Sequence, residues 1–336
     1  PDKLFRDQHF HVIQAIVESI DVENRQLVLQ DRRRLSYSSL LIATGASAVI
    51  PNVPGIQAEG VVKLDNLSDA HHILKQARKA RRAVVIGGGI TALELVEGLL
   101  AQGIETHYFL RGDRYWSSVL DEVESRIVES RLSMEGVKIH YFTDLLEVRE
   151  KKGKVIGVTA QQQGLQVSID CQLVAVAIGI KPRMQLAEAA GIATKRGILV
   201  DTMLQTSAPD IYAAGDVAQV YDRQKGDYFL DSLWHPAIQM GRVAGANMAG
   251  GKLNYIKKYP LNVTRLAGLV TTIIGRVGKE GTNSSTRPAR DADTVGIMRG
   301  DSEVWRLQPE AELVQTYQGD NRLRLYINQN RVVGAV

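Results

Sequence analysis

Three consecutive glycines stand where an apolar run gives way to an amphipathic one. Residues 83–86 are all apolar, Gly87, Gly88 and Gly89 follow, and apolar residues then recur at helical spacing until Gly103. A strand, a glycine turn and a helix in this order can bind a diphosphate, because glycines allow close approach and the helix N-terminus offers free N–H groups. The stretch therefore predicts a dinucleotide site. The weaker alternative is that the glycines only turn a strand into a helix.

The positions inside this turn have separate expected roles. Gly87 would make the tight turn, Gly89 would admit the pyrophosphate, and Gly88 lies between them. Ala92 stands where a third glycine is usual, and a small residue is enough there to let the helix pack closely on the strand.

The residues that would read the ribose are basic. An acidic residue is expected about 20 positions after the first glycine, yet residues 108–112 contain no carboxylate. Arg111 lies there and Arg114 follows, and a guanidinium pairs well with a 2′-phosphate. We therefore expect NADPH rather than NADH. In the alternative, both arginines are surface charges and Asp113 reads the ribose.

The elements that must position this turn alternate between strands and helices, which predicts an α/β fold. A helix is expected over 66–81, with Ser68 as a candidate N-cap, and another over 121–134. Further strands are expected at 10–20, 25–29, 35–37, 40–42, 104–110, 137–141, 145–150, 154–160, 165–173, 174–178 and 211–214. A helix over 235–248 follows, and the chain becomes β-like from about residue 259 onward.

Composition indicates an ordinary globular protein. Its 336 residues predict two or three domains, and 41 basic against 37 acidic residues give only a mild positive charge. The basic runs 32–34 and 75–82 are best read as solvated faces, since aromatic or motif support for nucleic-acid binding is absent. No apolar run is long enough to span a membrane, and the N-terminus lacks a signal-peptide pattern.

Cys171 is the one cysteine of the chain. It excludes an internal disulfide, a Cys-x-x-Cys redox pair and a cysteine-based zinc site, and the histidines show no metal-ligand spacing. Because its neighbours are apolar, we expect a buried, inert thiol, as suits a protein of the reducing cytoplasm.

Four segments together resemble the flavin-dependent pyridine nucleotide-disulfide oxidoreductase superfamily. They are residues 40–45, the glycine turn at Gly87, residues 174–182, and residues 204–216 with their Gly215-Asp216 ending. Residues 234–250, 259–262 and 268–275 resemble the rubredoxin reductase and nitrite reductase flavoprotein branch. The resemblance implies an enzyme that passes electrons from NADPH or NADH through FAD to a separate protein or small-molecule acceptor.

The resemblance also implies a Rossmann-like flavoprotein fold with two dinucleotide-binding domains and a small α+β C-terminal domain. The FAD-binding domain would comprise residues 1–62 and 181–255, the NAD(P)-binding domain 63–180, and the C-terminal interface or acceptor domain 256–336. A strand–glycine–helix unit that holds the FAD pyrophosphate normally opens this fold, but residues 1–39 contain no glycine. We therefore expect a fragment that lacks this unit, with a C-terminal domain that also stops early.

Site residues follow by matching positions. Glu94 matches an acidic residue that lies near the nicotinamide and flavin, and is the catalytic candidate; the alternative is an exposed helix glutamate. Gly179 and Pro182 match a turn beside the nicotinamide, which could equally be structural.

The flavin side is matched by a second set. Thr44 and Gly45 would approach the flavin dinucleotide, and Asp216 after Gly215 would bind its ribityl or pyrophosphate region. A helix N-cap role for Asp216 is the alternative, and it can hold at the same time. Trp234 would lie near the flavin ring, or would be a core tryptophan.

Two other functions stay open. A non-catalytic NAD(P)-binding fragment or scaffold, unable to hold FAD, is the main alternative. A disulfide reductase is disfavoured by the single cysteine and would require a cysteine pair in the N-terminal unit that this sequence lacks. A homodimer is compatible with a C-terminal domain of this kind, and the sequence does not identify the acceptor.

Overall fold

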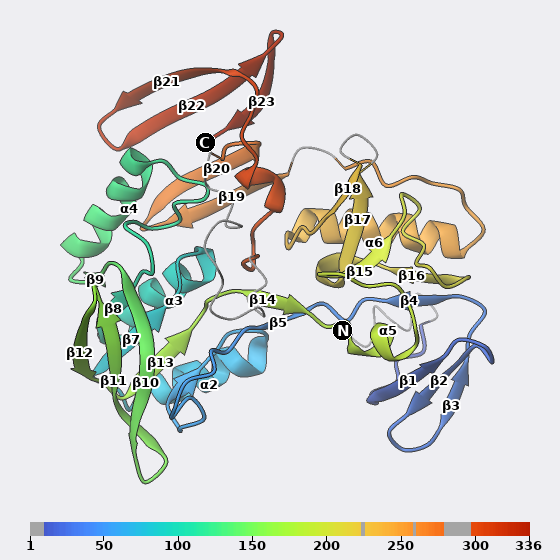
Figure 1. Cartoon of the computed structure of the whole chain (residues 1–336), viewed down its shortest axis with the longest axis horizontal. Coiled ribbons are helices and arrows are strands. Elements are labelled where there is room, and N and C mark those ends of the chain that lie inside the picture. Colours follow the sequence, from blue (N-terminus) through green and yellow to red (C-terminus); the bar gives the residue numbers. More distant parts are fainter. Residues whose placement is uncertain (1–9, 223–225, 258–259, 279–296) are drawn as a thin grey trace.

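The computed structural model describes residues 10–222, 226–257, 260–278 and 297–336. Two lobes lie side by side, and a third, β-rich part covers one of them (Figure 1). Residue 259, where one of the family-like segments begins, and residues 1–9 lie outside the described residues.

The first lobe is built on a parallel sheet. Its five strands, in spatial order, are β6 (Val61–Val62), β13 (Leu173–Val176), β7 (Arg82–Ile86), β8 (Glu105–Phe109) and β9 (Lys138–His140). Ala83 and Val85 belong to the core shared with α3 (Ile90–Leu100), whereas Val84 and Ile86 belong to a separate core on the opposite face. Because both faces are buried, β7 is apolar over residues 83–86, after Arg82 at its start. The expected α/β, Rossmann-like class is confirmed.

An antiparallel sheet covers the second face. It consists of β10 (Thr143–Lys151), β11 (Lys154–Gln162) and β12 (Leu165–Asp170). Val148 and Val158 pack against the parallel sheet together with Cys171, which is a free, fully buried thiol. Burial raises the pKa of Cys171 to about 12, so this thiol is inert, as expected.

The second lobe contains smaller sheets. They are β1–β2–β3 (Val17–Asp21, Gln26–Leu29, Arg34–Ser36), the parallel pair β4 (Leu40–Ile42) and β16 (Ile211–Ala213), and β15–β17–β18 (Ile198–Val200, Ala218–Asp222, Asp227–Phe229). The helices are α5 (Gln185–Ala189), α6 (Trp234–Met248) and the 3₁₀ turn η1 (Gly215–Val217). An antiparallel ribbon of β5 (Ala46–Ala48) and β14 (Ile180–Pro182) joins the two lobes (Figure 1).

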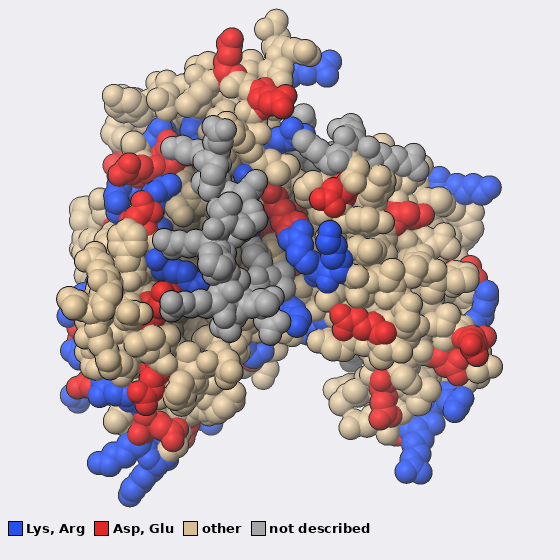
Figure 2. Space-filling view, in the orientation of Figure 1, with Lys and Arg blue, Asp and Glu red and all other residues tan. Residues whose placement is uncertain are grey.

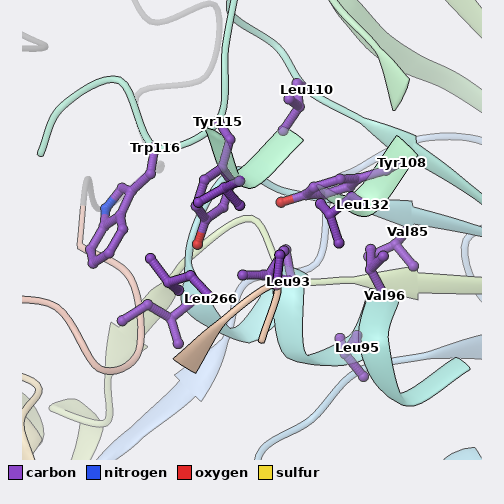
Figure 3. Close-up of a cluster of buried hydrophobic side chains, with 14 of the residues drawn as sticks. Val85, Leu93, Leu95, Val96, Tyr108, Leu110, Tyr115, Trp116, Leu132 and Leu266 are labelled. Atoms are coloured by element: carbon purple, nitrogen blue, oxygen red, sulfur yellow. The ribbon is translucent and has the colours of Figure 1, made fainter. Parts of the chain in front are cut away.

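The third part is an antiparallel sheet docked on the first lobe. Its strands, in spatial order, are β19 (Leu261–Leu266), β20 (Leu269–Gly275), β23 (Arg331–Ala335), β22 (Asn321–Asn328) and β21 (Glu312–Gln318), and η3 (Glu303–Arg306) lies beside it. Leu266 packs near Trp116 and Tyr115 in the core of the first lobe (Figure 3). Two buried ion pairs add to this contact, Arg322–Asp121 at 2.6 Å and Arg324–Glu124 at 3.0 Å.

Three local expectations need correction. The helix expected over 66–81 is α2 (Leu67–Ala77), and its N-cap is Asn66, whose side chain accepts the Asp69 N–H at 3.0 Å. Ser68 therefore lies inside the helix. The strand expected over 10–20 is only β1, because residues 10–16 have exposed side chains and pair with none of the strands in the described ranges.

Positive and negative side chains are interspersed on the face shown in Figure 2. The part of this face that is visible therefore offers no extended surface of one sign to a polyanion. None of the helices in the described ranges has the length and apolarity needed to cross a membrane.

Replacing the cap of α2 tests the corrected helix start. We expect Asn66→Ala to lower the free energy of unfolding by about 1 kcal/mol, because it leaves a first-turn N–H without an acceptor. Ser68→Ala is the matched control and should change it by less than about 0.5 kcal/mol. Denaturant unfolding followed by circular dichroism measures both, and a larger loss for Ser68→Ala would contradict the assignment.

Candidate functional site

The glycine turn lies at the carboxyl end of β7, in the middle of the parallel sheet. Gly87 has a φ of +143°, and a Cβ there would lie 2.2 Å from the Ala177 carbonyl oxygen and 3.1 Å from the Cβ of Ala92. Only glycine fits at this position, since both the conformation and the space exclude a side chain. Ala92 is fully buried and packs directly against the turn, as expected for a small residue at the third glycine position.

The start of α3 offers a polar cradle. A Cβ on Gly88 would meet nothing within 4 Å, so the main chain is open to a ligand there. Gly89 is the N-cap of α3, so no side chain caps the first N–H groups of the helix, and the first turn contains no acidic residue. The free N–H groups and the positive end of the helix dipole can therefore hold a diphosphate.

Arg111 and Arg114 follow β8, and the end of that strand lies beside this turn. The Gly87 N–H donates to the Phe109 carbonyl at 3.3 Å, which brings the end of β8 next to the glycines. Arg111 pairs with Asp144 at 2.9 Å on the exposed surface, and Arg114 pairs with Asp113 at 2.8 Å. Exposed ion pairs contribute little free energy, so Arg111 can exchange its partner for a phosphate. Asp113 is also close, and the choice of coenzyme stays a prediction.

A pocket lies between the glycine turn and the interlobe ribbon. Gly89, Gly179, Ile180 and the Met298–Arg299 pair are among its lining residues. Gly179 is buried with a φ of +142°. Pro182 does not line this pocket; it lies farther along β14, buried and in register with Ala46.

The second candidate position lies at the carboxyl ends of β4 and β16. Gly215 has a φ of +76°, and Asp216 follows it inside η1. The Asp216 carboxylate accepts a hydrogen bond from Ser232 Oγ at 3.1 Å and lies 3.8 Å from the Arg299 guanidinium. Burial raises the pKa of Asp216 above its usual range. The alternative that Asp216 is a helix N-cap is wrong, because Ala214 caps η1.

Thr44 and Gly45 share this edge. The Ala214 N–H donates to the Ile42 carbonyl at 3.2 Å, so the ends of β4 and β16 are adjacent. Gly45 has a φ of +66°, and Thr44 Oγ1 donates to the Arg183 carbonyl at 2.8 Å.

Trp234 begins α6 and is 83% exposed. The alternative that it is a core tryptophan is therefore wrong, because its ring lies outside the packed interior. An exposed indole two residues after the Asp216 partner Ser232 offers a flat apolar surface to a ligand.

Glu94 lies on the exposed side of α3, one turn after Thr91, which lines the pocket. Partial desolvation and the nearby Glu97 raise the pKa of Glu94. Its role at the reacting centre stays a prediction.

Three contributing residues are absent from the sequence-based set: Asp65, Arg183 and Arg299. The Asp65 carboxylate is only 1% exposed; it accepts the Ala48 N–H at 2.7 Å and pairs with Lys63 and with Arg299, the latter at 2.7 Å. Arg183 donates to the Thr44 carbonyl at 2.9 Å. Arg183 could have been found as the neighbour of Pro182, but no local pattern marks Asp65 or Arg299. Within the described ranges, no cluster of three or more His, Cys, Asp or Glu side chains could hold a metal ion.

Comparison with known proteins gives consistent matches. Residues 5–241 match the family described as pyridine nucleotide-disulphide oxidoreductase. The assimilatory nitrate reductase electron transfer subunit of Bacillus subtilis is 28% identical over 81% of this chain and 34% of its own length. The NADH-rubredoxin oxidoreductase of Clostridium acetobutylicum is 26% identical over 85% of this chain and 69% of its own.

Solved structures match as well. A ferredoxin reductase from Rhodopseudomonas palustris superposes with a TM-score of 0.84 and 25% identity, over 100% of this chain and 75% of that protein. The chain spans less than two thirds of the length of several curated relatives that it matches.

The space around the glycine turn yields a direct test. We expect Gly87→Ala to lower the free energy of unfolding by about 2 kcal/mol or more, through backbone strain and the clash with Ala177. Gly88→Ala should change it by less than about 0.5 kcal/mol, because its Cβ would enter open space. Equal effects of the two substitutions in denaturant unfolding would show that the turn is not constrained as described.

Proposed function

The chain belongs to the pyridine nucleotide-disulphide oxidoreductase family, and we propose that it acts as a FAD-dependent NAD(P)H oxidoreductase that passes electrons to a separate acceptor. One observation carries this proposal. A single side chain, Arg299, reaches from Asp216 in the second lobe, at 3.8 Å, to Asp65 beside the pocket of the first lobe, at 2.7 Å. The two candidate sites are thus close enough for two cofactors to meet between them.

In the first lobe, the glycine turn would hold the diphosphate of NAD(P)H. The N–H groups at the start of α3 would donate to its oxygens, and Gly88 leaves room for their approach. Arg111, with Arg114 near it, would pair with a 2′-phosphate, which supports NADPH over NADH. Gly179, Pro182 and Glu94 would lie toward the nicotinamide end.

In the second lobe, the Gly215–Asp216 edge would hold FAD. The buried Asp216 carboxylate accepts hydrogen bonds, so it suits the hydroxyl groups of a ribityl chain. Thr44 and Gly45 would flank the same cofactor, and the exposed Trp234 would cover part of an aromatic ring system. When bound, FAD accepts hydride from NAD(P)H and can release the electrons singly. The protein would position and orient the two cofactors and would exclude water from the space between them.

The segment roles follow from this arrangement. We assign FAD binding to residues 1–62 and 181–255, NAD(P) binding to 63–180, and the acceptor or interface role to 256–336. Cys171 itself would take no part in electron transfer, because it is buried. The acceptor would be an electron-transfer protein or a small molecule, and a free buried cysteine suits a cytoplasmic location.

A second candidate function has its own supporting observation. Arg299 already faces Asp216 in this structure, which favours a non-catalytic NAD(P)-binding protein whose flavin position is filled. Flavin absorbance of the purified protein, after incubation with FAD, separates the two functions. A protein that stays colourless but binds NADPH would contradict the oxidoreductase proposal.

Asp216→Ala tests the flavin site. We expect at least about a tenfold loss of FAD affinity, because a charge-assisted hydrogen bond contributes about 1.5–3 kcal/mol. Asp320→Ala, whose side chain pairs with Arg131 on the surface, is the matched control and should retain FAD. Flavin absorbance after gel filtration measures both, and equal retention would count against the assignment.

Arg111→Ala tests the coenzyme preference. We expect the dissociation constant for NADPH to rise about tenfold while that for NADH stays unchanged, because only NADPH carries the 2′-phosphate. Arg331→Ala, an exposed arginine of β23, should change neither. If Asp113→Ala instead weakens NADH selectively and Arg111→Ala has no effect, the carboxylate is the ribose reader.

A further inference from the structure

Met298 lies against the glycine turn of the proposed first-lobe site. A Cβ on Gly89 would lie 2.1 Å from Met298 Sδ, so the thioether lies directly against the turn that would receive the dinucleotide. With Met298 and Arg299 in place, the cavity has a volume of about 20 Å³. That volume holds one water molecule and no aromatic ring.

Arg299 fills the gap toward the second lobe. Its guanidinium pairs with Asp65 at 2.7 Å and lies 3.8 Å from Asp216, the carboxylate assigned to FAD. The contact with Asp216 is too long for a hydrogen bond, and Arg299 Nε, although buried, has no hydrogen-bond partner within the described part of the chain. The hydrogen-bonding groups of Arg299 are therefore only partly paired. Displacing this side chain costs less free energy than breaking a complete buried hydrogen-bond network.

The segment that carries these residues is anchored at both ends. The Ile180 N–H of the interlobe ribbon donates to the Ile297 carbonyl at 3.1 Å. At the other end, the Ser232 N–H donates to the Asp301 carbonyl at 3.0 Å, and Ser302 Oγ donates to the buried Asp231 carboxylate. We call residues 297–302 the strap, because its two ends are held while Met298 and Arg299 cross between the two candidate sites.

We propose that the strap is an autoinhibitory element that closes the site between the two lobes and must yield before a dinucleotide binds. The inference rests on the proposed function, since it assigns the same pocket to NAD(P)H. The strap and a bound dinucleotide would compete for the space in front of Gly89. Only the fraction of molecules in which the strap is displaced can bind the dinucleotide. The apparent affinity of the protein for NAD(P)H is therefore the intrinsic affinity multiplied by that fraction.

The decisive variant is Met298→Ala, which removes the side chain that fills the pocket but leaves the strap anchors and every charge intact. We expect it to bind both NADPH and NADH about tenfold more tightly than the unaltered chain in isothermal titration calorimetry. Met134→Ala, at the exposed end of α4 where Met134 is 86% accessible, is the matched control and should bind as the unaltered chain does.

Arg299→Ala provides an independent variant. It should tighten coenzyme binding as well and should also increase FAD uptake, because it frees Asp216. Its matched control, Arg331→Ala, should do neither.

The outcomes separate the two proposals. If the unaltered chain binds a coenzyme, but Met298→Ala binds it no more tightly than Met134→Ala does, the strap proposal is overturned and the proposed function stands. If neither the unaltered chain nor Met298→Ala binds NADPH or NADH, the proposed function fails, and the inference fails with it.

Discussion

The arrangement of the candidate site depends on one buried carboxylate, that of Asp65. A carboxylate removed from water must be compensated by several donors or cations, and Asp65 receives them from three parts of the chain: Lys63 beside it, the Ala48 N–H of the interlobe ribbon, and Arg299 of the strap. Burial alone would raise the pKa of Asp65, but these partners outweigh it and lower the pKa below its usual range. The ionised group thereby fixes the ribbon and the strap relative to the first lobe.

A second constraint is the closeness of the main chain at the end of the parallel sheet. The Gly87 backbone passes so near the Ala177 carbonyl that no side chain fits between them, and Ala92 presses α3 onto the same turn. Tight packing here has a functional consequence, because it points the uncapped start of α3 into open space at Gly88. The same few residues thus pack closely against the sheet and leave the start of α3 accessible to an anion.

The periodic features of the sequence predicted most of the fold. Continuous apolar runs predicted the strands of the parallel sheet, because such strands are buried on both faces. The helical spacing of apolar residues after Gly89 predicted α3, because one stripe of this helix is buried. Capping was harder to predict: Asn66 and Ser68 are both good N-cap residues, and only the backbone decides between them. Residues 10–16 resemble a strand in composition, but a strand needs a neighbour, which local sequence cannot supply.

The candidate site was predictable only where its chemistry is local. The glycines and Asp216 belong to short motifs, whereas the Asp65–Arg299 pair joins residues that are 234 positions apart. No periodicity links such distant positions, so long-range ion pairs emerge only from tertiary structure. The exposure of Trp234 is similar, since an aromatic residue at a helix start is compatible with either a core or a surface location.

The burial of Cys171 has a practical consequence. Because the chain has no other cysteine, its native surface carries no reactive thiol. Single cysteines introduced on either lobe could therefore be labelled selectively with spin probes or fluorophores, without first removing a native sulfhydryl. Interlobe distances in solution are thus open to direct spectroscopic measurement on an otherwise unaltered background.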